Sequence, residues 1–147
     1  MKESDSVCPV IAALYARDPA PRALGMEVLQ ARPGYARLRM QVREDMLNGH
    51  GMGHGGFIFS LADTAFAYAC NAANRATVGQ HCSITYLQPA MPGETLYATC
   101  EEVDRRGRSG IYDVQVTNAA GAAVALFRGH CREIGGAVVA PEQLPAS

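Results

Sequence analysis

One carboxylate stands alone in a long apolar stretch of the sequence. The run HGGFIFSLADTAFAYAC, residues 54–70, has the composition of a buried helix, and Asp63 is its single charged residue. The positions three and four residues away hold Phe59, Ser60, Phe66 and Ala67. An ionised carboxylate in an apolar interior needs a partner, a proton or a cavity. Asp63 therefore either caps a backbone group, pairs with an arginine such as Arg128 or Arg132, or serves as a functional carboxylate at a cleft. Its low helix propensity favours the last interpretation.

The start of the same helix is a second candidate for chemistry. Gly55 and Gly56 would present free N–H groups, which bind anions and stabilise a developing oxyanion. The alternative is a tight connection between two elements, and the lysine of a phosphate-binding P-loop is missing. Asn48, just upstream in LNGHGMGHGG, has a side-chain N–H that could reach a substrate carbonyl or hold a water.

Gly55 and Asp63 are too far apart on one helix to act on the same carbonyl group. Eight helical residues span about 12 Å, whereas a base and an oxyanion donor must each lie about 3 Å from the reacting atoms. Two antiparallel helices from two subunits would place Gly55 of one opposite Asp63 of the other. The spacing therefore predicts a symmetric dimer with two shared sites.

The histidines and cysteines carry weaker signals. His50 and His54 are four residues apart, but the glycines around them exclude a helix and no third ligand is evident, so no metal site is predicted. We expect His54 to hydrogen-bond in the loop or to pack against the helix start. His81 and His130 are expected to be satisfied polar residues of strands. The five cysteines contain no C-x-x-C pair and are predicted to be reduced thiols.

Three arginines gather in the segment DRRGRSG, residues 104–110. Arg105, Arg106 and Arg108 have two interpretations, a solvated hairpin end or a contact with the phosphate groups of a nucleotide-bearing substrate. Arg75, beyond the end of the long helix, is a weaker candidate of the same kind.

The elements that must position these residues follow from periodicity and turn signals. YARLRMQV alternates apolar and polar residues, as a half-buried strand does. The predicted elements are a helix at about 9–17 ended by DPAP at 18–21, strands at 26–31 and 35–42, a helix at 55–71, strands at 79–87, 95–103, 111–118 and 123–134, and a loosely ordered tail at about 137–147. A helix that is apolar all round must be enclosed. We therefore predict an α+β domain in which an antiparallel sheet curls around the helix, or a second subunit closes its other side.

Composition narrows the class of protein further. The chain has 147 residues, 48% of them hydrophobic and 18% charged, with a net charge of −1. This length fits one domain over 1–147, and the balanced charge predicts no binding to nucleic acid or anionic membranes. The acidic start MKESDSVCPV is unlike a signal peptide, so we expect a cytoplasmic protein. The low charge fraction indicates apolar surface that another subunit covers.

Four segments of the chain closely resemble one family: LNGHGMGHGGFIFSLADTAFAYACN, ITYLQPAMPGETLYA, GIYDVQVTN and VALFRGHCREIGG. From about Ala23 to Gly136 the sequence is similar to the bacterial phenylacetate-degradation (PaaI-type) acyl-CoA thioesterases of the hotdog-fold superfamily. The resemblance implies an antiparallel sheet wrapped around a central helix, a homodimer that pairs into a homotetramer, and hydrolysis without metal or organic cofactor. It also implies that Asp63 is the helix carboxylate, Gly55 the oxyanion donor and Asn48 the upstream polar side chain.

The mechanism expected from this resemblance starts with an acyl-CoA thioester at the helix N-terminus. The Gly55 N–H, assisted by Asn48, polarises the carbonyl, and Asp63 of the facing subunit attacks it or activates a water. The further residues expected to bind substrate are His54, Gly56, Arg105, Arg106 and Arg108. Aromatic acyl groups, phenylacetyl and its hydroxylated derivatives, are favoured by resemblance alone.

Two other functions fit parts of the sequence. A hotdog-fold 3-hydroxyacyl-thioester dehydratase would use His54 and Asp63 together, but this chain has GHGMGHGG where the dehydratases have a Pro-rich loop. A non-catalytic acyl-CoA binding protein would not need Asp63, and a DNA-reading sensor would need an added helix-turn-helix segment.

Overall fold

A six-stranded antiparallel sheet forms the body of the fold. The structure is a computed structural model, and it describes residues 7–145. The strands are β1 (Glu27–Arg32), β2 (Tyr35–Gln41), β3 (Thr77–Tyr86), β4 (Thr95–Arg106), β5 (Ser109–Thr117) and β6 (Ala123–Glu133). Their order across the sheet is β1-β2-β4-β5-β6-β3, and every neighbouring pair is antiparallel. β1 and β3 are therefore the two edges.

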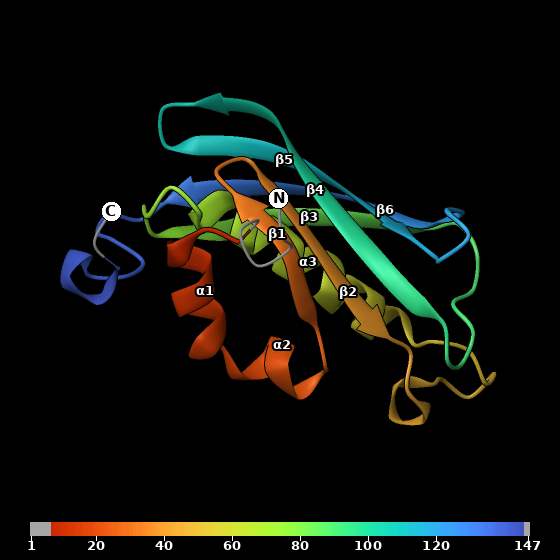
Figure 1. Cartoon of the computed structure of the whole chain (residues 1–147). Coiled ribbons are helices and arrows are strands. Elements are labelled where there is room, and N and C mark those ends of the chain that lie inside the picture. The colour runs from red at the N-terminus through yellow and green to blue at the C-terminus, as the bar shows by residue number, and fades with distance from the viewer. Residues whose placement is uncertain (1–6, 146–147) are drawn as a thin grey trace.

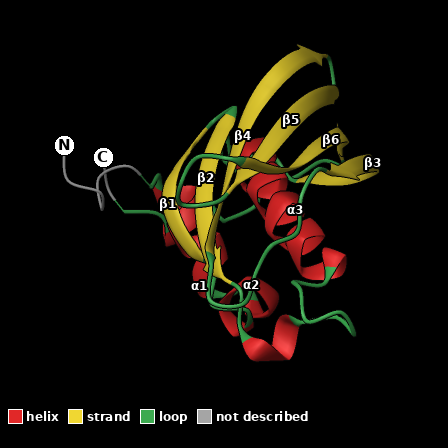
Figure 2. Ribbon diagram, turned by 90° about the vertical axis from the view of Figure 1, so that its right-hand side faces the viewer, coloured by secondary structure: helices red, strands yellow, loops and turns green. Residues whose placement is uncertain are grey.

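The long helix α3 (Gly55–Asn71) lies in the curve of the sheet, which bends around it (Figures 1 and 2). Alternate strand residues point at the helix. In β2 these are Ala36, Leu38 and Met40, which are fully buried. Because one face of each strand packs on α3 and the other faces out, the period-two pattern and the apolar helix form a single core. The predicted α+β fold with a central helix is confirmed.

Two short helices, α1 (Pro9–Ala16) and α2 (Pro19–Ala23), pack near α3 below β1 and β2 (Figure 1). The hydroxyl of Tyr68 in α3 donates a hydrogen bond to Asp18 Oδ2 at 2.9 Å, which ties the turn between them to the core. The first helix ends before residues 18–21, as predicted, but a second helix, α2, begins within that segment and was not predicted. Its two prolines fall in the first turn, where a helix has no use for their missing N–H groups.

The segment DRRGRSG forms strand rather than loop. The predicted strand ending at Val103 continues to Arg106, with Arg105 paired to Gly110 and Arg106 to Ser109. Only residues 107 and 108 make the turn, and Gly107 has a φ of +59°, which suits glycine. The three arginines and two glycines of this segment therefore hid an extended hairpin, in which β4 pairs with β5.

The described part of the C-terminal segment is packed, whereas we expected residues 137–147 to be loosely ordered. Val139 is 1% exposed, and its backbone N–H and carbonyl both bond to the side chain of Asn74 at 3.0 Å. The 3-10 helix η3 (Pro141–Gln143) follows. Residues 1–6, on which the signal-peptide argument partly rests, and 146–147 lie outside the described residues.

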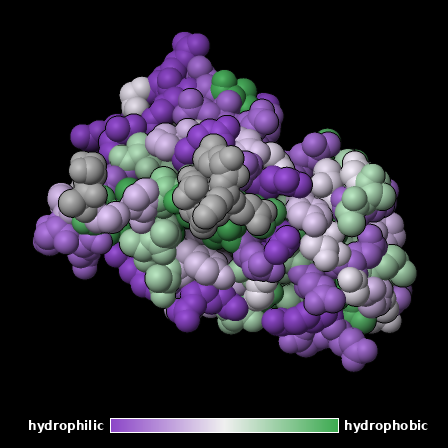
Figure 3. Space-filling model, in the orientation of Figure 1, coloured by the Kyte–Doolittle hydropathy of each residue, from purple (hydrophilic) through white to green (hydrophobic). Residues whose placement is uncertain are grey.

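The surface is mixed in character. On the face seen in Figure 1, apolar residues are scattered among hydrophilic ones (Figure 3). None of the helices between residues 7 and 145 combines the length and the apolar character that crossing a bilayer requires.

Candidate functional site

Asp63 lies on the side of α3 that the sheet leaves partly open. Its helical neighbours on that side, Ser60, Thr64 and Ala67, are likewise only half-buried. No residue between 7 and 145 forms an ion pair or hydrogen bond with its carboxylate. Arg128 pairs instead with Asp113, with Nε–Oδ1 at 2.6 Å. The predicted alternative of an arginine partner within one subunit is thus wrong for Arg128, and burial raises the pKa of the Asp63 carboxyl group above its usual value.

This raised pKa predicts how Asp63 affects stability. The folded protein holds the proton to higher pH than the unfolded chain does, so the stability that this group contributes is full below the unfolded pKa. It is lost as pH rises through the folded pKa. Asp63→Asn cannot ionise, so this variant does not lose stability as the pH rises. We expect its urea midpoint to exceed that of the wild type at pH 7, with a smaller difference near about pH 4, where aspartate begins to protonate. A less stable variant at pH 7 would show that the carboxylate has a stabilising partner.

The start of α3 leaves one main-chain donor unused. His54 is the N-cap, and its Nδ1 accepts a hydrogen bond from the Gly56 N–H at 2.9 Å. The Phe57 N–H donates to the His54 carbonyl at 3.0 Å. Within the described chain, no group accepts a hydrogen bond from the Gly55 N–H. The expectation that His54 bonds at the helix start is confirmed, and of the two glycines it is Gly55 whose N–H remains available.

The loop before the helix holds Asn48 by its side-chain oxygen. Asn48 Oδ1 accepts hydrogen bonds from the N–H groups of His50 at 2.9 Å and Met52 at 3.2 Å. The loop is tethered further by the Gly53 N–H, which donates to the Ala90 carbonyl at 2.7 Å. No described residue accepts from the side-chain amide of Asn48. Its N–H₂ group is therefore free to donate to a ligand.

An open groove of about 500 Å³ brings Asn48 and Gly55 together, and its other walls include Ile58, Tyr86, Leu87 and Ala90. Asp63 does not line it. At 1.5 Å per helical residue, Asp63 lies about 12 Å further along α3. The structure thus joins two of the three predicted catalytic residues in one subunit and keeps the third apart. A second groove, of about 450 Å³, lies on the outer face of the sheet around Asp113 and Arg128 and holds none of the predicted residues.

The edge strand β3 runs along α3 and has one residue near Gly55 and another near Asp63. The Tyr86 hydroxyl donates to the Gly55 carbonyl at 2.8 Å. At Cys82, burial and the charge of Asp63 together raise the pKa of the thiol, so this thiol lies near the carboxylate. Neither residue was singled out from the sequence. The only sequence signal for them was the period-two alternation of the strand, which puts Cys82, Ile84 and Tyr86 on one face.

The arginine cluster lies elsewhere in the subunit. Arg105 forms an ion pair with Glu133, and its Nη1 donates to the Tyr112 hydroxyl at 3.2 Å. Arg75 Nε reaches the same Glu133 carboxylate at 2.9 Å. Arg105 is therefore already held by protein groups.

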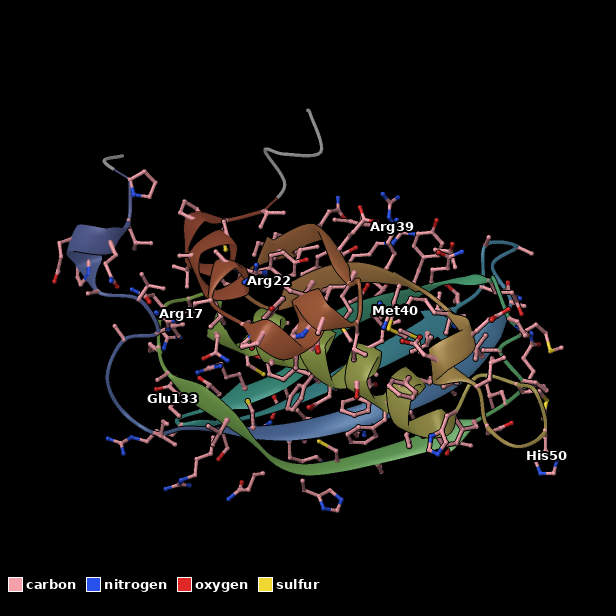
Figure 4. All side chains as sticks on the ribbon, turned by 90° about the horizontal axis from the view of Figure 1, so that it is seen from below. Arg17, Arg22, Arg39, Met40, His50 and Glu133 are labelled. Carbon is pink, nitrogen blue, oxygen red and sulfur yellow. The ribbon has the colours of Figure 1, made fainter. Side chains whose placement is uncertain are left out.

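Two arginines of the cluster point to solvent. Arg106 pairs with Asp104 at 3.0 Å, yet its side chain is 85% exposed, and Arg108 lies in the turn with an exposed side chain. Figure 4 places His50, in the loop before α3, and Glu133 at opposite ends of the molecule. One subunit therefore does not bring the arginines to Gly55.

The remaining histidines and cysteines lie apart from the groove. His81 and His130 face each other across β3 and β6, with ring centroids 5.5 Å apart. All five cysteines are free thiols, of which Cys70, Cys100 and Cys131 are buried. Among residues 7–145, no three or more His, Cys, Asp or Glu side chains are grouped to hold a metal ion.

Comparison with known proteins gives one consistent family. The family model described as "Thioesterase superfamily" matches residues 50–125, which contain Gly55, Asp63 and Tyr86. The acyl-coenzyme A thioesterase PaaI of Escherichia coli (strain K12) is 44% identical over 126 residues, which cover 86% of this chain and 90% of that protein.

Solved structures agree with this match. The E. coli PaaI protein from the phenylacetic acid degradation operon superimposes with a TM-score of 0.85 at 43% identity, covering 86% of this chain and 92% of that chain. A Streptococcus mutans UA159 protein solved with acetyl-CoA bound has a TM-score of 0.73 at 26% identity, covering 76% of this chain and 90% of that one.

Proposed function

The chain belongs to the thioesterase superfamily, and we propose that it is an acyl-CoA thioesterase of the PaaI type, acting on aromatic acyl groups at sites shared by two subunits. The observation that carries the proposal is that α3 holds two groups without a hydrogen-bond partner among residues 7–145, the Asp63 carboxylate and the Gly55 N–H. A base or nucleophile and an oxyanion donor are the two groups that thioester hydrolysis requires.

The proposed dimer forms through β3. This edge strand is exposed along most of its length, and Tyr86 (48%) and Leu87 (51%) are unusually exposed for apolar side chains. An edge of unpaired main-chain groups is a template for another strand. If a second copy of β3 pairs antiparallel so that Tyr86 lies opposite Cys82 of the partner, the two-fold axis passes through Ile84. Each Gly55 then lies beside the other subunit's Asp63. Assembly of two dimers into a tetramer remains a prediction.

The chemistry follows from these positions. The thioester oxygen accepts from the Gly55 N–H and the Asn48 amide, which polarises the carbonyl carbon. Asp63 of the facing subunit either removes a proton from a water that attacks the carbon, or attacks the carbon itself and is released by water afterwards. The tetrahedral intermediate collapses, the C–S bond breaks and CoA leaves as a thiolate, which then takes up a proton. Because a thiolate is a good leaving group, the reaction needs neither a metal nor an organic cofactor.

The same two-fold axis suggests where CoA lies. In this dimer the Thr77 end of the partner's β3 lies toward the Gly55 end of the first subunit. The turn between β4 and β5 of the partner lies at the same end. The partner's Arg106 and Arg108 are then available for the CoA phosphates, since phosphate is well matched by exposed guanidinium groups. Arg105 is held by Glu133 and positions the hairpin.

One aromatic contact near the helix start supports the proposal of an aromatic acyl group. The half-buried ring of Phe59, one turn beyond Gly55, meets Phe127 edge-on with centroids 5.4 Å apart, and edge-to-face contact is a favourable arrangement of aromatic rings. We expect kcat/KM for phenylacetyl-CoA and hydroxyphenylacetyl-CoA to exceed that for acetyl-CoA and palmitoyl-CoA by about tenfold or more, the range of pocket discrimination by shape. Release of free CoA across the four substrates measures it.

Two results would contradict this proposal separately. Equal kcat/KM values across the panel would remove the aromatic preference and leave the thioesterase intact. Dehydration of a 3-hydroxyacyl-CoA, followed by the absorbance of the enoyl product, without hydrolysis of any thioester would replace the reaction itself.

A further inference from the structure

Tyr86 makes a contact with the helix start that the proposed chemistry does not use. It is the last residue of β3, and its hydroxyl donates a hydrogen bond to the Gly55 carbonyl at 2.8 Å, across 31 positions of sequence. In the single subunit the side chain is 48% exposed. The contact joins the edge strand to the first residue of α3.

The ring of Tyr86 also fits the glycine at position 55. A Cβ atom at Gly55 would lie 2.9 Å from both Cζ and the hydroxyl oxygen of Tyr86, which is closer than carbon atoms approach without a shift. Glycine therefore lets the phenol lie directly over the main chain. The ring and the missing side chain are complementary, and together they form one wall of the groove that holds Asn48 and Ile58.

The main-chain groups next to Gly55 are held from the loop side. The His54 N–H donates to the Met46 carbonyl at 2.8 Å, and His54 itself caps Gly56. Both partners belong to the segment that precedes or begins the helix, which is rich in glycine and gains little rigidity from its own backbone. Tyr86 holds Gly55 from the sheet, which is the rigid part of the fold.

We propose that Tyr86 is a positioning residue for thioester hydrolysis, whose hydroxyl fixes the Gly55 residue so that its N–H points at the developing oxyanion. This inference rests on the proposed function, in which Gly55 is the oxyanion donor. Small errors in the placement of such a donor are costly, since a displacement of about 1 Å can lower a rate about 10²-fold. A single lost hydrogen bond permits a smaller shift than that.

The direct test is Tyr86→Phe, which keeps the ring and removes the hydroxyl. We expect kcat for phenylacetyl-CoA to fall about tenfold, as for a modest loss of donor alignment, with KM within about twofold and an unchanged urea midpoint. The matched control is Tyr35→Phe, which removes the hydrogen bond from Tyr35 to Gln30 at 3.2 Å on strands away from the groove. It should leave kcat and KM unchanged.

A double-mutant cycle separates positioning from a general structural role. Gly55→Pro deletes the N–H that Tyr86 is proposed to aim. In that background Tyr86→Phe should lower kcat by less than about twofold, because no donor is left to align and the Cβ of proline already displaces the ring of Tyr86. An equal tenfold fall in both backgrounds would overturn the proposal, and so would a wild-type kcat for Tyr86→Phe alone. A fall in kcat that accompanies dissociation of the dimer, measured by light scattering, would also overturn it.

The same cycle tests the positioning role of Tyr86 separately from the oxyanion role of Gly55. If Gly55→Pro retains full activity, the oxyanion role of Gly55 fails and Tyr86 has nothing to position. If Gly55→Pro is impaired and Tyr86→Phe is not, only the role of Tyr86 is lost.

Discussion

Replacing Asp63 with asparagine is expected to lower kcat for acyl-CoA hydrolysis by about 10³-fold, within the range that general acid–base catalysis supplies, and Asp63→Ala is expected to abolish turnover. The amide of asparagine has nearly the shape of the carboxylate, but it neither accepts a proton from water nor attacks a thioester. Because no described residue pairs with Asp63, the substitution leaves no buried group without its partner. Release of CoA under saturating substrate measures the loss.

The control for Asp63 is a carboxylate of the same type with a different environment. Asp113→Asn breaks the pair with Arg128 on the outer face of the sheet, and we expect kcat to stay within about twofold, since exposed ion pairs contribute little and this one lies away from the groove. Substantial activity in Asp63→Asn would mean that Asp63 only orients the substrate. Activity near the wild-type level in Asp63→Ala would remove it from the mechanism.

The second large effect is expected at Gly55, where one substitution deletes the donor and another keeps it. Proline is well tolerated at the first position of a helix, and His54 before it already has the extended backbone, ψ 133°, that a following proline requires. Gly55→Pro should therefore fold and lose about 10²- to 10³-fold in kcat, the usual effect of removing an oxyanion-hole donor.

Gly55→Ala is the matched variant, because it adds the same Cβ and retains the N–H. Its Cβ displaces the ring of Tyr86, which lies 2.9 Å away, so we expect a loss of about tenfold, as for imperfect alignment of the donor. The comparison of the two variants assigns the difference to the N–H group. Equal activities for Gly55→Pro and Gly55→Ala would show that the main-chain donor takes no part.

Mixing the two inactive variants tests whether the site is shared. A dimer of one Asp63→Ala subunit and one Gly55→Pro subunit, isolated with two affinity tags, contains one site with both groups intact and one with neither. We expect about half of the wild-type activity per dimer, because one of its two sites survives. If each site came from a single subunit, the mixed dimer would be as inactive as its parents.

The sequence predicted the elements that depend on local pattern. The helix at 55–71 was placed correctly because its seventeen positions are rich in apolar residues, begin at a glycine pair and end at an asparagine. β2 was recognised because its alternation is strict. The hairpin around Gly107 was mistaken for a loop, since three arginines and two glycines hide a strand whose pairing is decided by β5. α2 was missed because its prolines were taken as breakers rather than as first-turn residues.

The candidate site was predictable only in part, because some of its contacts join residues far apart in the sequence. Asp63 and Gly55 stand out because each is unusual for its place in the chain. Tyr86 has an ordinary place in an alternating strand, and its role depends on a contact across 31 positions. The sequence predicted only that His54 would hydrogen-bond in the loop or pack against the helix start. The resemblance assigned the oxyanion role to Gly55, and the hydrogen bond from the Gly56 N–H to His54 supplies a physical reason to prefer Gly55 over Gly56.

The isolation of Asp63 also bears on how a turnover ends. Hydrolysis converts a neutral thioester into a carboxylic acid, which ionises at neutral pH. Within residues 7–145 no cation stands beside Asp63, so once the carboxylate has regained its charge, two negative groups share one partly buried space. Their repulsion acts on the product and not on the substrate. If Asp63 acts as proposed, the isolation of its carboxylate would also favour release of the acid product.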